Sequence, residues 1–389
     1  MKERLMVGIV GSGIIGLAHA LAFARQNCQV TVYERESTPL GASIRNFGLF
    51  WPLGQEKELL GTVARSKQIW YNILDQAGIQ VNRCGSLIVA PQLDELEVIR
   101  EFFELESHLR PGLTLNSRNE LSAKYRYLRH RKLLGGLRSS EEFCVNPRTA
   151  IPKIITFLQS HFDVKFRFNT TIREVSDRYL YSDTKLWQAD VILICTGDEY
   201  STLLPQHFAK SGLHACHLQM MKAIPKAMID LKSVFCGGLS MIQYPSFSSC
   251  KSLKEVKHRH KEEMPGVMKA GIHVILSQNT DGELIIGDSH LYQSQKPVFI
   301  DQGINNMIIQ YLDKFMRLPD YGITEQWQGS YSFHPYKKHY FEQTAQNIWV
   351  STGFGGAGMT LGFGQAEENV AHIIDKIGIH ANPTAGKVA

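Results

Sequence analysis

The stretch Gly11-Ser12-Gly13-Ile14-Ile15-Gly16 decides the fold of this chain. It follows an apolar run at residues 5–10, which is typical of a buried parallel strand, and it opens an amphipathic helical pattern at 14–27. A second apolar run at 30–33 ends at Glu34, about twenty residues after the glycines. This order predicts a βαβ unit whose glycine turn and helix N-terminus bind the pyrophosphate of a dinucleotide.

Each residue type in this stretch has a physical role. Gly11 permits a tight turn, Gly13 lets a pyrophosphate approach the backbone, and Gly16 lets helix and strand pack closely. Glu34 can accept hydrogen bonds from ribose hydroxyls. We therefore predict that the dinucleotide contacts Gly11, Gly13, Ile14, Ile15, Gly16, Glu34 and Arg35. The pattern does not separate a flavin from a nicotinamide dinucleotide, because proteins that bind either one use it.

Composition narrows the class of protein. The 389 residues, 43% hydrophobic and 20% charged, are typical of a globular chain of one large or two smaller domains. We find no apolar run of membrane-spanning length and no secretory pattern, which predicts a cytoplasmic location without membrane insertion. A net charge of +5 does not point to nucleic acid. Seven cysteines without a CxxC spacing indicate reduced thiols, with neither a disulfide framework nor a metal site. The basic stretch 251–261 is predicted as a solvated loop.

The rest of the chain alternates strand and helix patterns. Strand-like runs occupy 86–90, 165–169, 172–175, 190–195, 271–278, 283–287 and 348–351. Helical patterns occupy about 56–78, 92–109, 148–161, 300–315 and 359–377. Asn279-Thr280-Asp281-Gly282 predicts a hairpin turn between two of the strands. An alternating first part and a strand-rich middle predict an α/β protein whose nucleotide domain is interrupted by a second, sheet-based domain.

Three further segments resemble motifs of the D-amino acid oxidase and glycine oxidase (DAO) family. Gly41-Ala42-Ser43-Ile44-Arg45-Asn46-Phe47-Gly48 resembles its flavin-contacting loop. The run from Asp190 to Gly197 is similar to its second nucleotide motif. Thr352-Gly353-Phe354-Gly355-Gly356-Ala357-Gly358-Met359-Thr360 is similar to its C-terminal flavin motif, and Asn146-Pro147-Arg148 also matches a recurrent pattern. These segments stand in the family's order and favour a flavin.

The resemblance implies FAD, held non-covalently. A glycine loop that leads into a helix N-terminus brings backbone N–H groups to the flavin's pyrimidine edge, which becomes negative on reduction. The resemblance also implies the following FAD contacts: Ser43, Arg45, Asn46, Gly48, Val175, Thr196, Gly197, Gly355, Gly356, Gly358, Met359 and Thr360. It further implies a Rossmann-like FAD domain of glutathione-reductase type and an α+β substrate domain on an antiparallel sheet. The former would comprise 1–80, 145–212 and 335–389, and the latter 81–144 and 213–334.

The chemistry that the resemblance implies is oxidation of a small primary or secondary amine. Hydride leaves the amine-bearing carbon for flavin N5, the imine hydrolyses to a carbonyl compound, and O2 reoxidises the flavin to give H2O2. This needs no side-chain base, so we predict no catalytic residue. The alternatives are a D-amino acid, glycine or sarcosine oxidase, a dehydrogenase with a non-oxygen acceptor, or a flavoprotein that has lost its chemistry and serves as a partner subunit. The oligomeric state is left open.

One departure from the family pattern bears on the substrate. Amino-acid-oxidising relatives carry Trp-x-Gly-x-Arg-Pro, whose arginine binds the substrate carboxylate bidentately. Here the segment begins at Trp327, and Tyr331 and Ser332 replace the arginine and proline. We expect a differently shaped anion, and the chain resembles a branch of the family associated with phosphonate catabolism. That implies an aminophosphonate such as 2-aminoethylphosphonate or its N-methyl form. Candidate substrate contacts are Arg45, Asn46, Tyr244, His273, Tyr331, His334 and Lys337.

Overall fold

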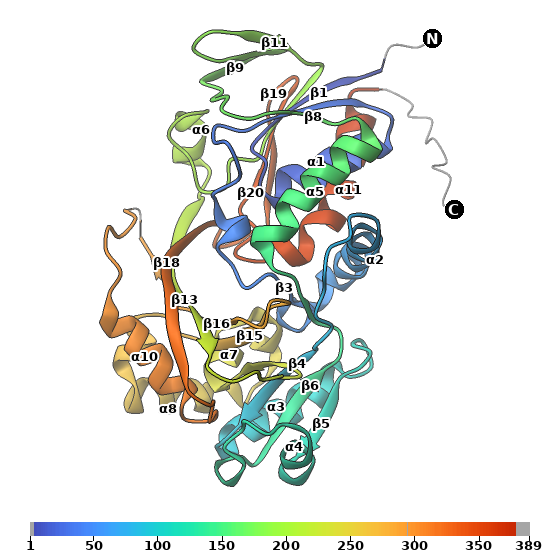
Figure 1. Cartoon of the computed structure of the whole chain (residues 1–389). Coiled ribbons are helices and arrows are strands. Elements are labelled where there is room, and N and C mark those ends of the chain that lie inside the picture. The colour runs from blue at the N-terminus through green and yellow to red at the C-terminus, as the bar shows by residue number, and fades with distance from the viewer. Residues whose placement is uncertain (1–3, 294, 379–389) are drawn as a thin grey trace.

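The structure, a computed structural model, describes residues 4–293 and 295–378 and contains two large sheets, one in each half of the molecule (Figure 1). The first sheet has six strands in the order β19-β20-β12-β1-β2-β8. Its strands are β1 (Met6–Val10), β2 (Gln29–Tyr33), β8 (Lys165–Arg167), β12 (Val191–Ile194), β19 (Tyr340–Ala345) and β20 (Ile348–Thr352). All pairs are parallel except β19 with β20.

Both faces of this sheet are covered, as a parallel sheet requires. Val191 and Leu193 of β12 face a core formed with the helices, whereas Ile192 and Ile194 face the other side and pack with Leu180. The covering helices are α1 (Ile14–Arg25), α2 (Leu60–Gln76), α5 (Pro147–Phe162) and α11 (Gly358–Lys376). The opposite face is covered by a small antiparallel sheet of β9 (Glu174–Ser176), β10 (Tyr179–Tyr181) and β11 (Leu186–Gln188).

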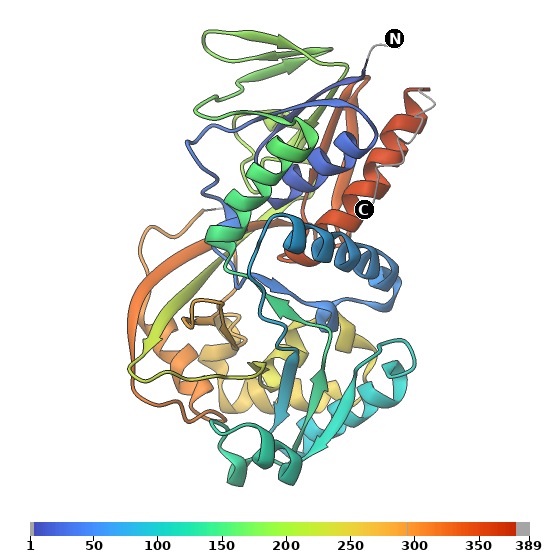
Figure 2. The ribbon, with the colours of Figure 1, turned by 45° about the vertical axis from the view of Figure 1, so that its right-hand side comes forward.

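The second sheet has nine strands in the order β17-β13-β16-β15-β14-β4-β6-β5, with β18 on the free side of β13. Its strands are β4 (Ser86–Ala90), β5 (Thr114–Ser117), β6 (Gly135–Ser139), β13 (His214–Pro225), β14 (Val234–Cys236), β15 (Ile275–Gln278), β16 (Leu284–Gly287), β17 (Leu291–Tyr292) and β18 (Tyr321–Phe333). The long pair β13–β18 runs from one half of the molecule into the other (Figures 1 and 2).

Shorter elements complete the two halves. The helices are α3 (Leu93–Glu106), α4 (Arg118–Lys124), α6 (Pro205–Lys210), α7 (Gly238–Gln243), α8 (Leu253–Glu263), α9 (Pro265–Lys269) and α10 (Gln302–Leu312). β3 (Leu49–Phe50) pairs with β7 (Phe143–Cys144) in a two-stranded antiparallel ribbon. The ribbon joins a segment that precedes β4 in the sequence to one that follows it.

The predicted α/β class is confirmed, and the first βαβ unit lies where the glycine pattern put it. The turn at 279–282 joins β15 to β16 as an antiparallel hairpin. The domain boundaries at residues 80, 144, 212 and 334 stay a prediction. Every strand of the six-stranded sheet falls in the segments assigned to the FAD domain, and every strand of the nine-stranded sheet falls in the others.

Three predictions of local structure were wrong in whole or part. The basic stretch 251–261 is mostly helical, within α8, because Leu253 and Val256 are buried and Arg259 binds Asp94 and Glu95 of α3. The strand expected at 271–278 begins only at Ile275, and that at 172–175 is displaced to β9. The long strands β13 and β18 were missed: β13 does not alternate regularly between polar and apolar residues, and the alternation in the second half of β18 was overlooked.

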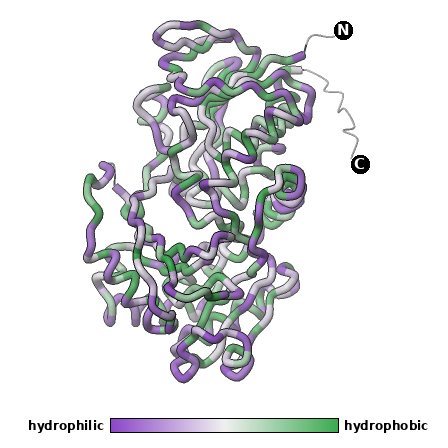
Figure 3. Tube along the Cα trace, viewed as in Figure 1, coloured by the Kyte–Doolittle hydropathy of each residue, from purple (hydrophilic) through white to green (hydrophobic). Residues whose placement is uncertain are grey.

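Hydropathy varies over short distances along the whole trace (Figure 3). Among residues 4–293 and 295–378, no helix is both long and apolar enough to cross a membrane. All seven cysteines are buried and free.

The contact between α1 and α11 contains a buried titratable group. His19 is 0% exposed. Its Nδ1 lies 2.8 Å from the Ile15 carbonyl oxygen, and Asn369 Nδ2 lies 3.1 Å from its Nε2. Nδ1–H therefore donates to the carbonyl, and Nε2 accepts from the amide, which fixes the neutral tautomer. Burial lowers the pKa of this imidazole to about 4.

This burial predicts acid sensitivity. An unfolded histidine has a pKa of about 6.5, so between that pH and about 4 the unfolded chain binds one more proton at this site. The contribution of neutral His19 to the free energy of unfolding is fully present above pH ~6.5. It decreases by about 3 kcal/mol as the pH falls toward 4. We expect His19→Gln to flatten the dependence of unfolding free energy on pH in that window, measured by urea titration. The exposed His258→Gln is the control and should leave the slope unchanged; an equal flattening in both variants would contradict this assignment.

Candidate functional site

A cavity of about 740 Å³ lies where the ends of β1, β2, β12 and β20 meet the nine-stranded sheet. The glycine turn forms one wall. Gly11 has φ +104°, and a Cβ there would lie 2.4 Å from the Cys195 carbonyl oxygen. A Cβ on Gly16 would lie 2.0 Å from the Gly11 carbonyl oxygen. Both positions therefore require glycine, and the turn is held tightly against β12 and α1.

Gly13 is different, because its missing side chain leaves space on the cavity side. A Cβ there would meet only Ser43 Oγ, at 3.0 Å. That hydroxyl accepts a hydrogen bond of 2.8 Å from the Ile14 N–H at the start of α1. The helix N-terminus and this small cradle suit the pyrophosphate of a dinucleotide.

Hydrogen bonds to neighbouring residues hold the Glu34 side chain in place. Its Oε2 accepts hydrogen bonds from Ser12 N at 3.0 Å and Ser12 Oγ at 2.6 Å, and its Oε1 accepts one from Glu36 N at 3.1 Å. The carboxylate is 8% exposed and lines the cavity. Its position is fixed by the backbone at the two strand ends.

The C-terminal glycine motif forms the opposite wall. Gly353, Gly355 and Gly356 have φ of +73°, +58° and +84°, so the chain can turn sharply from β20 into α11. Thr352 Oγ1 donates a 2.7 Å hydrogen bond to the Gly197 carbonyl oxygen, which ties this motif to the end of β12. The N-terminus of α11 thus faces the cavity, as the resemblance implies.

Most predicted FAD contacts line this cavity. They are Gly11, Gly13, Ile14, Ile15, Glu34, Arg35, Ser43, Arg45, Asn46, Thr196, Gly197, Gly355, Gly356, Gly358, Met359 and Thr360. Three do not. Gly16 serves helix packing, and Gly48 serves a turn, since a Cβ on it would lie 1.9 Å from the Val145 carbonyl oxygen. Val175 is turned into the core beneath β9, and residues 170–172 line the cavity instead.

The predicted substrate contacts divide in the same way. Arg45, Asn46, Tyr244, His273 and Tyr331 line the cavity, and His334 and Lys337 do not. His334 Nδ1 accepts hydrogen bonds from the N–H groups of Tyr336 and Lys337, at 3.1 and 3.0 Å, and so closes a turn. The Lys337 ammonium lies 4.8 Å from the centre of the Tyr340 ring. These two residues have structural contacts outside the site.

Tyr331 links the substrate side of the cavity to the flavin motif. On β18 it pairs with Cys216 of β13. A Cβ on Gly356 would lie 3.4 Å from its ring, and the ring centre is 6.2 Å from that of His290. Burial raises the pKa of the Tyr331 phenol well above its usual value. A neutral hydroxyl therefore occupies the position where amino-acid-oxidising relatives have arginine.

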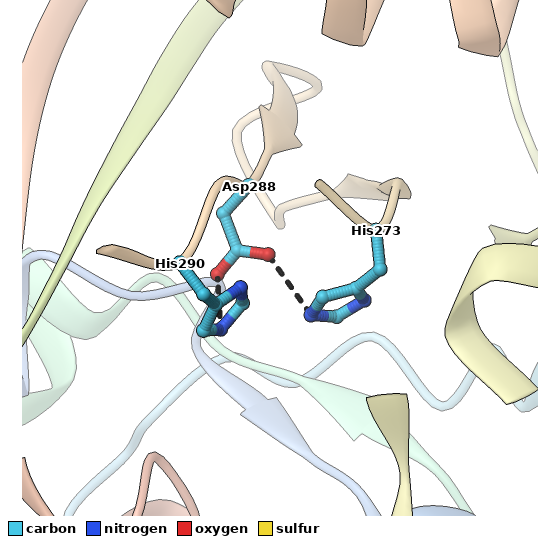
Figure 4. A group of neighbouring side chains, drawn as sticks. All are labelled: His273, Asp288 and His290. Carbon is cyan, nitrogen blue, oxygen red and sulfur yellow. Dashed lines mark ion pairs between the residues drawn. The ribbon is translucent and has the colours of Figure 1, made fainter. Parts of the chain in front are cut away.

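Two residues that were not predicted from the sequence, Asp288 and His290, lie beside the predicted His273 in the same cavity wall. His273, Asp288 and His290 are 4%, 6% and 6% exposed and face one another (Figure 4). Asp288 Oδ1 lies 3.1 Å from His273 Nε2, and Oδ2 lies 3.7 Å from His290 Nε2. The backbones of His273 and Asp288 exchange two hydrogen bonds beyond the β15–β16 hairpin, which fixes the pair. The signal in the sequence was the Asp-x-His spacing, which puts both side chains on one face of an extended segment.

Burial sets the charge state of this group. It raises the pKa of the Asp288 carboxyl well above its usual value. It lowers the pKa of His290 to about 4 and that of His273 well below its usual value. The ligand atoms of the three side chains lie within 4.8 Å of one another, a spacing that also suits divalent metals, although the sequence predicted no metal site.

Cations gather at the outer end of the cavity. Arg45 and Lys296 line both the main cavity and an adjoining one of about 660 Å³, where Arg148 also lies. Arg148 is paired with Glu325 at 2.6 Å. Within the described part of the chain Arg45 makes no ion pair; its Nη1 donates to the Gln328 carbonyl oxygen at 3.4 Å.

The cradle at Gly13 predicts the effect of filling it. Gly13→Val places a branched side chain where the pyrophosphate would lie, so we expect loss of bound dinucleotide with the fold retained. The ratio of absorbance at 450 and 280 nm of the purified protein, together with circular dichroism, measures both. Gly61→Ala, where an added Cβ meets nothing within 4 Å, is the matched control. A Gly13→Val protein that remains yellow would place the cofactor elsewhere.

Comparison with known proteins agrees with this geometry. Human mitochondrial L-2-hydroxyglutarate dehydrogenase is 28% identical over 131 residues, which are 31% of this chain and only 28% of that relative. Glycine oxidase from Geobacillus kaustophilus has a similar structure, with TM-score 0.74, 14% identity and coverage of 96% of this chain and 95% of its own. FAD-bound L-α-glycerophosphate oxidase from Mycoplasma pneumoniae has TM-score 0.70, 18% identity and 95% coverage of both chains.

These structural neighbours share the fold at low sequence identity. The family described as FAD dependent oxidoreductase (DAO) matches residues 6–371, nearly the whole chain. The match includes the glycine turn, the acid after β2 and the glycine loop before α11. The chain therefore belongs to the DAO family and is an FAD-dependent oxidoreductase.

Proposed function

We propose that this protein oxidises a small amine that carries a phosphonate group, such as 2-aminoethylphosphonate or its N-methyl form. The FAD would be held non-covalently, and oxygen would be the final electron acceptor, giving H2O2. The observation that carries the proposal is the neutral Tyr331 at the position of the relatives' arginine, combined with cations at another place in the cavity.

The position of those cations favours a substrate with separated charges. Arg45 and Lys296 lie at the outer end, whereas the buried wall contains Tyr244, Tyr331 and the carboxylate of Asp288. A substrate with an anion at one end and an amine at the other matches this distribution. An α-amino acid, whose two charged groups are two bonds apart, matches it less well.

The shape of the anion also supports a phosphonate. A planar carboxylate is best bound by the fork of one guanidinium, whereas a tetrahedral dianion suits several donors in different directions. Arg45 and Lys296 come from two segments far apart in the sequence and can approach such a group from different sides. The glycerophosphate oxidase neighbour is named for a phosphate-bearing substrate, and glycine oxidase for an amine.

The residues of the chain then have distinct tasks. When bound, FAD supplies the acceptor for the hydride that leaves the amine-bearing carbon. Tyr331 and Tyr244 offer neutral hydroxyls beside the reacting end, and burial raises the pKa of both. Trp51 and Phe47 line the same region and help to exclude water. Arg45 and Lys296 would hold the anion and so fix the direction of the amine.

A panel of amines tests the proposal. We expect anaerobic bleaching of the flavin by 2-aminoethylphosphonate and N-methyl-2-aminoethylphosphonate, and no comparable bleaching by glycine, sarcosine or D-alanine. Absorbance at 450 nm measures it. Bleaching by the amino acids alone would refute the phosphonate proposal. Peroxide formed in air with the same substrate would support oxygen as acceptor, and bleaching without peroxide would point to another acceptor.

The anion assignment predicts unequal effects of removing Arg45 and Arg148. Arg45→Gln should raise the KM for the phosphonate by about tenfold or more, because a charge-assisted contact is lost. Arg148→Gln should have a smaller effect, since this guanidinium lines only the adjoining cavity and is neutralised by Glu325. Steady-state kinetics on both variants, with FAD content checked, give the comparison. Equal effects would contradict the role of Arg45.

A further inference from the structure

We propose that Asp288 binds the substrate's amino group as an ammonium ion, between His273 and His290, and that these side chains take up the proton the amine must lose before oxidation. This inference rests on the amine oxidation proposed above and assigns the residues that recognise the amine. In the proton step an N–H bond of the ammonium breaks and an O–H or N–H bond forms on the acceptor. The electron pair stays on the amine nitrogen.

The first argument is a buried carboxyl group with an unsatisfied oxygen. Asp288 Oδ1 is buried and accepts no hydrogen bond from the described residues, although His273 Nε2 is only 3.1 Å away. A buried carboxylate without a partner is costly, and the usual partners are Lys and Arg. Asp288 has ion-pair contacts only with the two histidines among residues 4–293 and 295–378. The other titratable side chains around it are neutral thiols and phenols, Cys216, Cys236, Tyr244, Tyr292 and Tyr331.

The second argument comes from the tautomers of the two histidines. His290 Nδ1 lies 3.1 Å from the Gly271 carbonyl oxygen and must donate to it. We assign the donor role to His273 Nδ1, because Ser240 Oγ, 3.4 Å away, can then donate to the Val274 carbonyl oxygen, also at 3.4 Å. Both Nε2 atoms are therefore acceptors, and both face the carboxylate.

Once Asp288 is ionised, three acceptors converge, and the three side chains offer them no donor. A primary ammonium group has three N–H donors and one positive charge. It can satisfy one carboxylate oxygen and both Nε2 atoms at once, and it neutralises the buried charge. A secondary ammonium has two donors and would leave one acceptor unpaired. The geometry therefore favours the primary amine over its N-methyl form.

The position of the group fits contact with the reacting end of a substrate. All three side chains line the cavity, and the ring of Tyr331 lies between His290 and Gly356 of the flavin motif. The cations Arg45 and Lys296 lie elsewhere in the same cavity, where the adjoining cavity begins.

Proton linkage follows from burial. Burial raises the pKa of Asp288, so the carboxyl holds a proton in the ligand-free protein at pH values where it would otherwise be ionised. Binding of an ammonium ion displaces that proton. Affinity for an amine should then increase as the pH rises, by up to about tenfold per pH unit while Asp288 is protonated in the free protein. An amine-free ligand should not show this increase.

The test uses dead-end ligands whose amine-bearing carbon has no hydrogen. The FAD-loaded protein is titrated with (2-amino-2-methylpropyl)phosphonate and with (2,2-dimethylpropyl)phosphonate, in which a methyl group replaces the amine. A carboxylate pair, 2-aminoisobutyrate and 2,2-dimethylpropanoate, is run alongside. Changes in the flavin spectrum give each Kd. In wild type the Kd of the amine in each pair should be lower than that of its amine-free partner by about tenfold or more. This is the effect expected of one charge-assisted hydrogen bond.

Asp288→Asn should reduce this preference to about twofold or less, while the Kd of the amine-free ligand changes little. Glu95→Gln is the matched control, because Glu95 is also a buried carboxylate beside a histidine, His260, but lies outside the cavity. It should retain the preference. If Asp288→Asn does not fold, the pH dependence of the two Kd values in wild type tests the same contact.

The outcomes separate the two proposals. Wild type could prefer the amine only within the carboxylate pair and lose this preference in Asp288→Asn. That result would support the role of Asp288 in binding the amine and would refute a phosphonate substrate. A preference that survives in Asp288→Asn, or equal pH slopes for the paired ligands, would overturn the assignment. So would the absence of any amine preference in wild type, or a stoichiometric metal ion that wild type retains and Asp288→Asn loses.

Discussion

The close contact between the glycine turn and the end of β12 is the constraint on which the site depends. Because Gly11 has no Cβ, the turn lies directly against the Cys195 carbonyl oxygen. That contact directs the N-terminus of α1 into the cavity and aligns the ends of β1 and β12. Thr352 then ties the third motif to Gly197 by one hydrogen bond. Three segments separated by more than a hundred residues each are thereby brought to one cavity.

The nine-stranded sheet forms the other wall of the cavity, and there strand pairing positions the side chains. Its strands β13 and β18 pair along nearly their whole length and carry Tyr331 to the flavin motif. The β15–β16 hairpin carries His273 and Asp288 as cross-strand neighbours, so their separation is fixed by backbone hydrogen bonds. A polar group built in this way can remain buried and ordered, because its position does not depend on side-chain contacts alone.

The proteins of similar structure show that this fold is compatible with very different sequences. Glycine oxidase and glycerophosphate oxidase share the fold at 14% and 18% identity, so most side chains can differ without a change of fold. Specificity then lies in few positions. In this chain the cavity is lined by the Tyr331 phenol, by Arg45 and Lys296, and by a buried carboxyl group between two imidazoles.

The sequence by itself determined the FAD half of the site, because each of its contacts depends on short-range patterns. A glycine turn, a helix start and an acid at a strand end are local features, and sixteen of the nineteen predicted FAD contacts line the cavity. Gly16, Gly48 and Val175 do not line it, since a glycine or valine serves packing or a turn as readily as a ligand. The substrate half was decided by tertiary structure. His334 and Lys337 follow β18 in sequence but do not line the cavity, and Asp288 comes to lie in the cavity wall only through burial and through pairing with His273. Burial and cross-strand pairing join residues distant in sequence, and no local pattern encodes them.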